Sequence, residues 1–416
     1  MADYDVINGW INYRLFPERQ GVVARRWKLT ELGKPECIRS SWYRFEKGTE
    51  MTAKNEGRME NGMEIHKRRN QSGSAKNGNA NGTVKHGTNG EKCSELLVHE
   101  VPPQFREMFI ISGYRRPYST AKECFLSLFR PCNNECMNVW THLLPLMCFI
   151  VHFGRTLSGL SLSDPYNYPL ICFALGICGF CSMSCGAHTF NCMSPRLRHI
   201  CFFFDYAAIA VYCFGASQVF FYYGRPAFTD VTLFKSRWLF LGISAVISLG
   251  ANFLCCASRH RWLAAKYIIR TMPFVIVFLF IVSPVVWRTF TCDEPTDCNA
   301  ESLPYHKRHG WFYVFSALIN VARLPERLMP GTFDYIGNSH HFLHLFTALG
   351  AADEFSAIFS DMTRRRAILS TAEGPTFMNS VGLMAVFSAL NIVIVLYFAS
   401  TLKSDSEEDN SGTPES

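Results

Sequence analysis

Long apolar runs dominate the chain from residue 137 to residue 402, whereas the first 120 residues or so are polar. A run of about 18 or more apolar residues is long enough to cross a bilayer as a helix. Eight segments fit this pattern: 139–157, 168–188, 200–223, 238–257, 271–288, 309–324, 340–359 and 377–401. The pattern predicts an all-α membrane protein. The sixth segment is short and the seventh begins with histidines, so these two fit least well.

The polar regions divide the rest of the chain. Residues 1–110 are expected to be a polar and largely disordered N-terminal region, because 50–95 is rich in Asn, Gly, Ser and Lys and cannot bury enough apolar surface to fold. A juxtamembrane segment follows at 111–138, then a membrane core at 139–360, the extra span at 377–401 and an acidic tail at 402–416. The start, MADYDVINGWINYRLF, lacks the pattern of a signal peptide.

Most of the 17 cysteines lie inside the apolar segments, where they behave as small hydrophobic residues. The stretch CDEPTDC is different, because it places Cys292 and Cys298 in an acidic loop between the fifth and sixth spans. A disulfide forms there only if the loop faces an oxidising compartment, and two free thiols are the alternative.

Charges flanking the spans give little help with orientation, because the two sides carry equal numbers of Lys and Arg. The basic stretch before the first span, with Arg115, Arg116 and Lys122, favours a cytoplasmic N-terminus. That orientation also places Cys292 and Cys298 outside.

Several polar side chains lie inside the predicted spans, where ionisable residues are rare and usually functional. Ser184 and His188 stand four apart at the end of the second span, Asp205 lies one turn into the third, and His340 and His344 stand four apart at the start of the seventh. Residues four apart share one face of a helix. Because the chain direction alternates between spans, all five side chains are expected at one side of the membrane.

Three neutral imidazoles with an open fourth position are typical of a zinc site. We therefore expect His188, His340 and His344 to hold zinc, with Asp205 accepting a proton or hydrogen bond and Ser184 orienting water. His341 lies about 100° around the helix from His340 and is expected to face the lipid headgroups. Alternatively, the histidines bond to water or backbone, Asp205 pairs with Arg196 or Arg198, and Ser184 is a helix–helix contact.

Three ordered motifs resemble the progestin and adipoQ receptor family of seven-helix membrane proteins. They are SGYRRPYSTAKECFLSLF with NECMNVWTH, then SMSCGAHTFNCMSPRLRHICFFFDY, then LPERLMPGTFDYIGNSHHFLH. The wording is most similar to the membrane progestin receptor branch, which has an eighth helix after its seven-helix transmembrane bundle. The sequence departs from the family at Cys136, where Thr is usual, and at His341, where Gln is common. Neither position belongs to the expected zinc ligands.

The resemblance implies a plasma-membrane receptor for progestins or related lipids, with zinc at the three histidines and signalling through heterotrimeric G proteins or kinases. It also implies a second reading, a zinc-dependent amide hydrolase of the ceramidase type, since that activity has been proposed for adiponectin-receptor relatives. A third reading makes zinc purely structural. We rank the receptor first, and we expect no nucleic acid among the partners.

Overall fold

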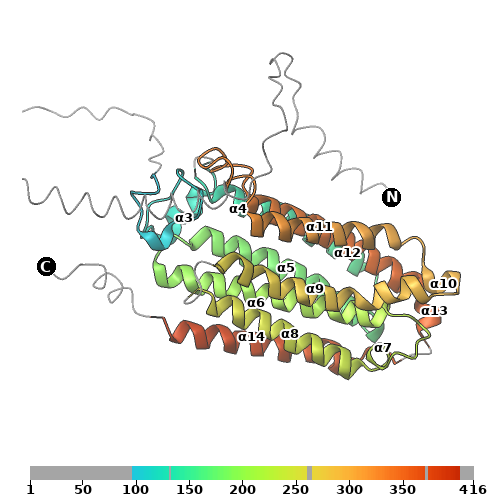
Figure 1. Ribbon diagram of the computed structural model, residues 1–416. Coiled ribbons are helices and arrows are strands. Elements are labelled where there is room, and N and C mark those ends of the chain that lie inside the picture. The colour runs from blue at the N-terminus through green and yellow to red at the C-terminus, as the bar shows by residue number, and fades with distance from the viewer. Residues whose placement is uncertain (1–95, 131–132, 260–264, 371–372, 403–416) are drawn as a thin grey trace, which may run out of the picture. The chain divides into compact units, whose positions relative to one another are not determined.

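A computed structural model describes residues 96–130, 133–259, 265–370 and 373–402, and its elements are almost entirely helical (Figure 1). The extended structure among these residues is one isolated bridge between Leu96 and Tyr114. The expectation of an all-α membrane fold is confirmed. The segments expected to be disordered, 50–95 and the end of the tail, lie outside the described residues, and the predicted domain boundaries remain predictions.

Each of the eight predicted segments coincides with a long helix. The helices are α4 (Cys136–Ser158), α5 (Tyr168–Phe190), α6 (Pro195–Val219), α8 (Arg237–Ala257), α9 (Lys266–Thr291), α11 (Leu303–Ala322), α12 (Ser339–Arg364) and α14 (Leu383–Ser400). A π-helical turn, Phe220–Gly224, extends α6, and another, Met378–Gly382, leads into α14.

Seven of these helices, all except α11, are long and apolar enough to cross a membrane within the described part of the chain. α11 begins six residues before the predicted span, and the added turns include His306, Lys307 and Arg308, which lower its hydropathy. It nevertheless packs along the length of α12 (Figure 1). The protein is therefore a multi-pass membrane protein.

The bundle has two ends that differ in their short elements (Figure 1). One end, called the α3 end below, carries α3 (Ala121–Ser127), the end of α5 and the starts of α6 and α12. The other, called the α10 end, carries α7 (Thr232–Lys235), α10 (Pro295–Cys298) and α13 (Arg366–Leu369). At the α10 end the structure joins Cys292 and Cys298 in a disulfide, with Cα atoms 5.3 Å apart.

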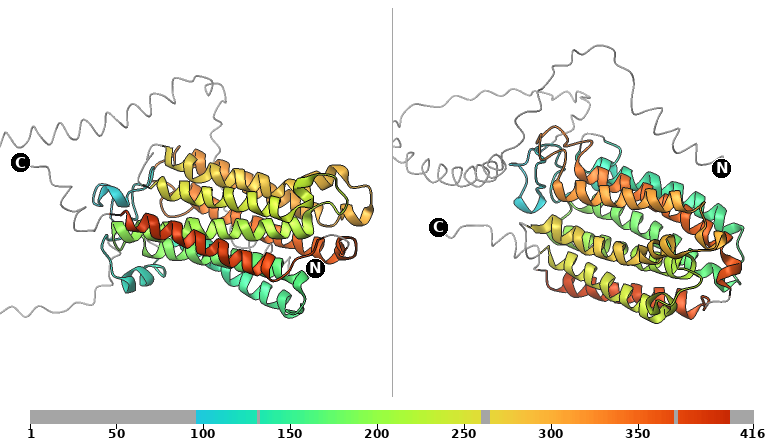
Figure 2. Two further views of the ribbon diagram at one scale, coloured as in Figure 1. Left: turned by 90° about the horizontal axis from the view of Figure 1, so that it is seen from below. Right: turned by 45° about the vertical axis from the view of Figure 1, so that its right-hand side comes forward.

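Glycines bring α5 and α6 into close contact at the centre of the bundle. A Cβ at Gly176 would lie 3.1 Å from the Cα of Tyr212, and a Cβ at Gly215 would lie 3.2 Å from the Cα of Phe173. Small residues at such crossings let membrane helices pack backbone to backbone. α14 packs on α6 and α8, on the flank away from α11 and α12 (Figure 2).

Local sequence explains where the site-bearing helices begin. Ser194 caps α6 by accepting a hydrogen bond from the Leu197 amide, and Pro195 occupies the first turn, where its missing N–H is not needed. Asn338 caps α12 by accepting from the amides of His340 and His341. Both caps fix the first turns of helices whose polar side chains meet at the α3 end.

Candidate metal centre

Three imidazoles from two helices converge at the α3 end of the bundle. His188 lies in the last turn of α5, and His340 and His344 lie in the first two turns of α12. Each ring offers one nitrogen as a ligand atom, and these three nitrogens all lie within 4.8 Å of one another. The structure therefore brings together the three residues that the sequence grouped.

Hydrogen bonds to the outer nitrogens orient two of these rings. Nδ1 of His188 lies 2.7 Å from Oε2 of Glu135, and Nδ1 of His344 lies 3.0 Å from the carbonyl oxygen of Asn138. A carboxylate and a carbonyl can only accept, so each Nδ1 carries the hydrogen and each Nε2 keeps its lone pair. The donor set suits zinc, which prefers neutral imidazoles held in this way by outer acceptors.

Nε2 of His188 and Nε2 of His340 are 3.0 Å apart. The lone pair on Nε2 of His188 can accept a hydrogen bond from Nε2–H in one neutral tautomer of His340. In the other tautomer Nε2 of His340 also carries a lone pair, and the two nitrogens can then share a metal ion. Both rings are withdrawn from solvent, His188 fully and His340 in part.

Glu135 joins His188 to a wider network. Its Oε1 accepts from Asn191 and its Oε2 from Asn138, both at 2.7 Å. Burial opposes ionisation of Glu135, but the His188 ring and the Arg115 guanidinium outweigh it and hold its pKa well below the usual range. Sequence reasoning missed this role, although Glu135 stands in the quoted block NECMNVWTH.

Arg115 clamps the end of α5 from the juxtamembrane segment. Its guanidinium donates to the carbonyl oxygens of His188 (2.7 Å) and Thr189 (2.8 Å) and to Oδ1 of Asn191 (2.7 Å). The last carbonyls of a helix have no partner inside the helix, and a basic side chain here also complements the helix dipole. The clamp fixes the turn that presents His188.

The position of His341 differs from the expectation that it faces headgroups. His341 is buried, and its Nδ1 accepts from the amides of Gly337 (3.0 Å) and Asn338 (3.3 Å). Gly337 has φ +87°, a left-handed conformation that suits glycine, and it turns the chain into α12. His341 is therefore the second member of a capping box, in which its side chain accepts from the backbone amide of Asn338 while the Asn338 side chain accepts from the amide of His341. Helical periodicity alone does not show this local bond.

The loop before α12 explains other letters of the motif LPERLMPGTFDYIGN. Glu326 is fully buried, accepts from the amide and hydroxyl of Ser339, and pairs with Arg323. Oδ2 of Asp334 accepts from the amide of Ser112 at 2.7 Å, which ties the loop to the juxtamembrane segment. These buried carboxylates hold the start of the histidine-bearing helix in place.

Asp205 and Ser184 are both buried at the α3 end. Oδ1 of Asp205 has no hydrogen-bond partner among the described residues, and the carboxylate is within electrostatic reach of His188. The alternative pairing with Arg198 does not occur, since that guanidinium bonds to Glu107 at 2.6 Å. A buried carboxylate oxygen without a partner is costly unless it is protonated or bound by a ligand.

Further ionisable residues inside the helices were missed from the sequence. His142 of α4 stacks on His344 with ring centroids 3.8 Å apart, and neither of its nitrogens has a described hydrogen-bond partner. Deeper in the bundle, Glu354 accepts from the hydroxyls of Tyr212 and Tyr313, the latter at 2.8 Å. The rule that selected Asp205, an ionisable residue within an apolar run, would also have selected His142 and Glu354.

A second buried polar cluster lies at the α10 end. The two oxygens of Asp361 accept from Arg288 (2.9 Å), Asn299 (2.7 Å), Ser302 (2.7 Å) and Nε2 of His306 (2.9 Å). Asp361 is fully buried, and the partners come from α9, the loop after α10 and α11. This cluster ties three parts of the chain to α12.

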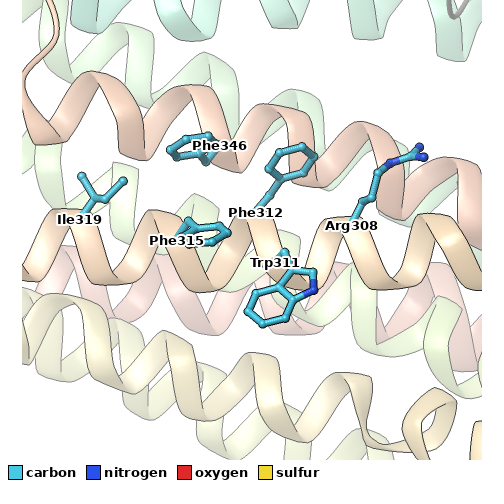
Figure 3. Close-up of a pocket in the computed structure, with 6 residues that line it drawn as sticks. All are labelled: Arg308, Trp311, Phe312, Phe315, Ile319 and Phe346. Carbon is cyan, nitrogen blue, oxygen red and sulfur yellow. The ribbon is translucent and has the colours of Figure 1, made fainter.

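An open groove of about 360 Å³ runs between α11 and α12 (Figure 3). Its lining is apolar except for one cation: Trp311, Phe312, Phe315, Ile319 and Phe346, with Arg308. None of the candidate zinc ligands lines it. Trp311 and Phe315 are exposed, as expected of side chains that contact lipid.

Comparisons with known proteins agree with this architecture. Residues 130–355 match the family described as Haemolysin-III related. The membrane progestin receptor delta of Homo sapiens is 37% identical over 75% of this chain and 92% of that protein. The membrane progestin receptor gamma-A of Danio rerio is 35% identical over 73% of this chain and 92% of that protein. The membrane progestin receptor gamma of Homo sapiens is 32% identical over 73% of this chain and 93% of that protein.

Proposed function

The chain belongs to the Haemolysin-III related family, which confirms the predicted relationship. From this premise we propose that it is a membrane receptor for progestin-like steroids or related lipids, with zinc at His188, His340 and His344. The names of the relatives support the ligand class. The observation that carries the zinc proposal is the convergence of three imidazole nitrogens at one end of the bundle.

In this proposal the chain's own residues prepare the centre. Glu135 and the Asn138 carbonyl fix the ring orientations, so the lone pairs of His188 and His344 face inward. Arg115 and the α12 cap hold the helix ends that carry the rings. Zinc bound there would supply a Lewis acid that also acidifies a coordinated water.

A second function, a zinc-dependent amide hydrolase of the ceramidase type, is favoured by Asp205. Its unpartnered Oδ1 would accept a proton from water that attacks an amide carbonyl, and Ser184 would orient that water. The two functions are compatible, because a bound steroid could regulate turnover. In the third alternative, zinc only joins α5 to α12 and the site carries no chemistry.

The decisive experiment uses the full chain in lipid nanodiscs. Metal content, progesterone binding and fatty acid released from ceramide are measured on wild type, His344→Ala and a control, His306→Ala, which changes a buried histidine at the α10 end. The proposal expects about one zinc per wild-type chain, loss of zinc only in His344→Ala, and saturable progesterone binding.

The outcomes separate the alternatives. Fatty acid release that disappears in His344→Ala and in Asp205→Asn supports the hydrolase. Zinc without turnover, together with steroid binding that survives His344→Ala, supports a receptor with structural zinc. A well-folded wild type that neither holds zinc nor binds progesterone contradicts the proposal.

The remaining expectations concern the membrane and the partners. We propose a plasma-membrane location with the α3 end in the cytoplasm, supported by the Cys292–Cys298 disulfide at the α10 end, which suits an oxidising compartment. Heterotrimeric G proteins remain proposed partners at the cytoplasmic face. Protease protection of an N-terminal tag in intact cells tests the orientation.

A further inference from the structure

Two free cysteines from separate parts of the chain meet at the α3 end. Cys124 lies in α3 and Cys192 lies two residues after the end of α5, and their Sγ atoms are 3.4 Å apart across a sequence separation of 68 residues. Both side chains are buried, with exposed fractions of 1% and 5%. Neither belongs to the candidate metal centre.

We propose that Cys124 and Cys192 are a redox-sensitive pair that closes into a reversible disulfide when the compartment at the α3 end is oxidised. This inference does not rest on the receptor proposal or on zinc.

The geometry requires little movement. A disulfide has a sulfur–sulfur distance of about 2.05 Å, so the two sulfurs must approach by about 1.4 Å. α3 has only seven residues, with Phe125 exposed on its outer face, and is not enclosed by the bundle. Side-chain rotation together with a small shift of this short helix can supply the approach.

The chemistry of Cys192 favours reaction. A hydrogen bond from the Cys124 thiol, helped by the nearby Arg115 guanidinium, lowers the pKa of Cys192 to about 7. Since the thiolate is the nucleophile, this lower pKa raises the reactive fraction of Cys192.

The reaction balances with hydrogen peroxide as the oxidant. The Cys192 thiolate attacks one peroxide oxygen, the O–O bond breaks, and Cys192 becomes a sulfenic acid as hydroxide leaves. The Cys124 thiol then attacks that sulfur, forming the S–S bond and releasing water. In total, two thiols and one peroxide give one disulfide and two waters. Burial excludes a bulky thiol such as glutathione, so Cys124 is the resolving partner.

The disulfide would fix α3 to the helix that carries His188. The juxtamembrane segment already contacts the end of α5 through Arg115 and through a hydrogen bond from the Tyr118 amide to the Cys192 carbonyl, at 2.9 Å. A covalent bond beside these contacts would restrict their opening.

The test uses the full-length protein in nanodiscs, first reduced with dithiothreitol and desalted. Samples with and without hydrogen peroxide are denatured in acid, alkylated with N-ethylmaleimide, digested and analysed by mass spectrometry. We expect a linked Cys124–Cys192 peptide only after peroxide, a fall of at least about fivefold in alkylation of both cysteines, and reversal by dithiothreitol.

Variants sharpen the test. Cys124→Ser should give no linked peptide and should leave Cys192 as a sulfenic acid that dimedone traps, whereas Cys201→Ser, a matched change on α6 at the same end, should keep the link. Cys124 and Cys192 that both stay fully alkylated after peroxide in the wild type, or Cys192 joined to another cysteine, would overturn the proposal. Because the readout is the disulfide itself, failure of zinc or steroid binding does not affect it.

Discussion

Buried histidines and carboxylates lie at both ends of the helix bundle, but their partners differ. At the α10 end, Asp361 accepts four hydrogen bonds, one of them from Arg288, so its charge and both its oxygens are compensated. At the α3 end, three imidazole nitrogens converge, and Oδ1 of Asp205 has no partner among the described residues.

This difference separates structural polar residues from a candidate site. A buried carboxylate with both oxygens bonded holds helices together and leaves no position for a ligand. Three converging imidazole nitrogens can hold a cation, and an unpartnered carboxylate oxygen remains unfavourable until something binds. Burial alone would have ranked Asp205 and Asp361 as equals, whereas their hydrogen-bond partners separate them. The difference lies between these two carboxylates, because nitrogens of Arg288 and His306 at the α10 end also have no described partner.

The largest expected effect is a loss of stability when the ion pair of Asp361 at the α10 end is broken. Asp361→Ala leaves the Arg288 charge buried without its carboxylate, which costs about 3–5 kcal/mol. Thermal unfolding in nanodiscs should show a strong loss of stability with zinc binding retained in the folded fraction. Asp230→Ala, which removes an exposed ion pair with Lys235, should change little, and an equal loss in both variants would contradict the comparison.

The next largest effect is stabilisation by zinc at the α3 end, where the three imidazole nitrogens converge. A ligand that binds only the folded state at 100 times its Kd stabilises it by about 2.7 kcal/mol. Added zinc should therefore raise the unfolding temperature of the wild type but not of His340→Ala. If zinc stabilises both proteins equally, the imidazoles do not hold it.

A smaller effect is expected from the support of His188. Glu135→Gln keeps a hydrogen-bond acceptor but removes the negative charge, and such changes behind a ligand typically lower metal affinity about 10–100-fold. Competition with a fluorescent chelator measures this loss. Glu123→Gln, an exposed carboxylate of α3, is the control and should bind zinc as the wild type does.

The smallest effect concerns pH at the α3 end. Burial raises the pKa of Glu107, but Lys266, Arg198 and Arg323 outweigh it and hold the value at about 2. Because this folded-state pKa lies below the unfolded value of 4.5, the stabilisation is present above about pH 4.5 and is lost as the pH falls toward 2.

Glu107→Gln should therefore lower stability at pH 7 by less than about 1 kcal/mol, since the carboxylate is partly exposed, and should flatten the loss of stability on acidification. Chemical denaturation at a series of pH values measures it. An unchanged acid profile in the variant would exclude Glu107 as a source of the pH dependence.

The family and the grouping of the three histidines followed from local sequence. Ordered motifs predicted the family, and the spacing of His340 and His344 by four residues predicted that they share a helix face. Alternating chain direction placed His188 at the same end of the bundle. The role of Glu135 did not follow, because no local pattern shows which loop residue will reach Nδ1 of a distant histidine.

The sequence by itself determined the number and approximate bounds of the eight long helices, because a backbone in lipid must satisfy its own hydrogen bonds and therefore forms helices wherever the chain is apolar for long enough. Tertiary structure alone decided which polar side chains are satisfied. Asp205 and Asp361 are both carboxylates inside apolar helices. The rotation of each helix and its neighbours give Asp361 four hydrogen-bond donors, whereas Oδ1 of Asp205 has none among the described residues. Capping likewise decided the position of His341. The backbone amides of Gly337 and Asn338 donate to its ring and hold it in the protein, although helical periodicity predicts that the ring faces the headgroups.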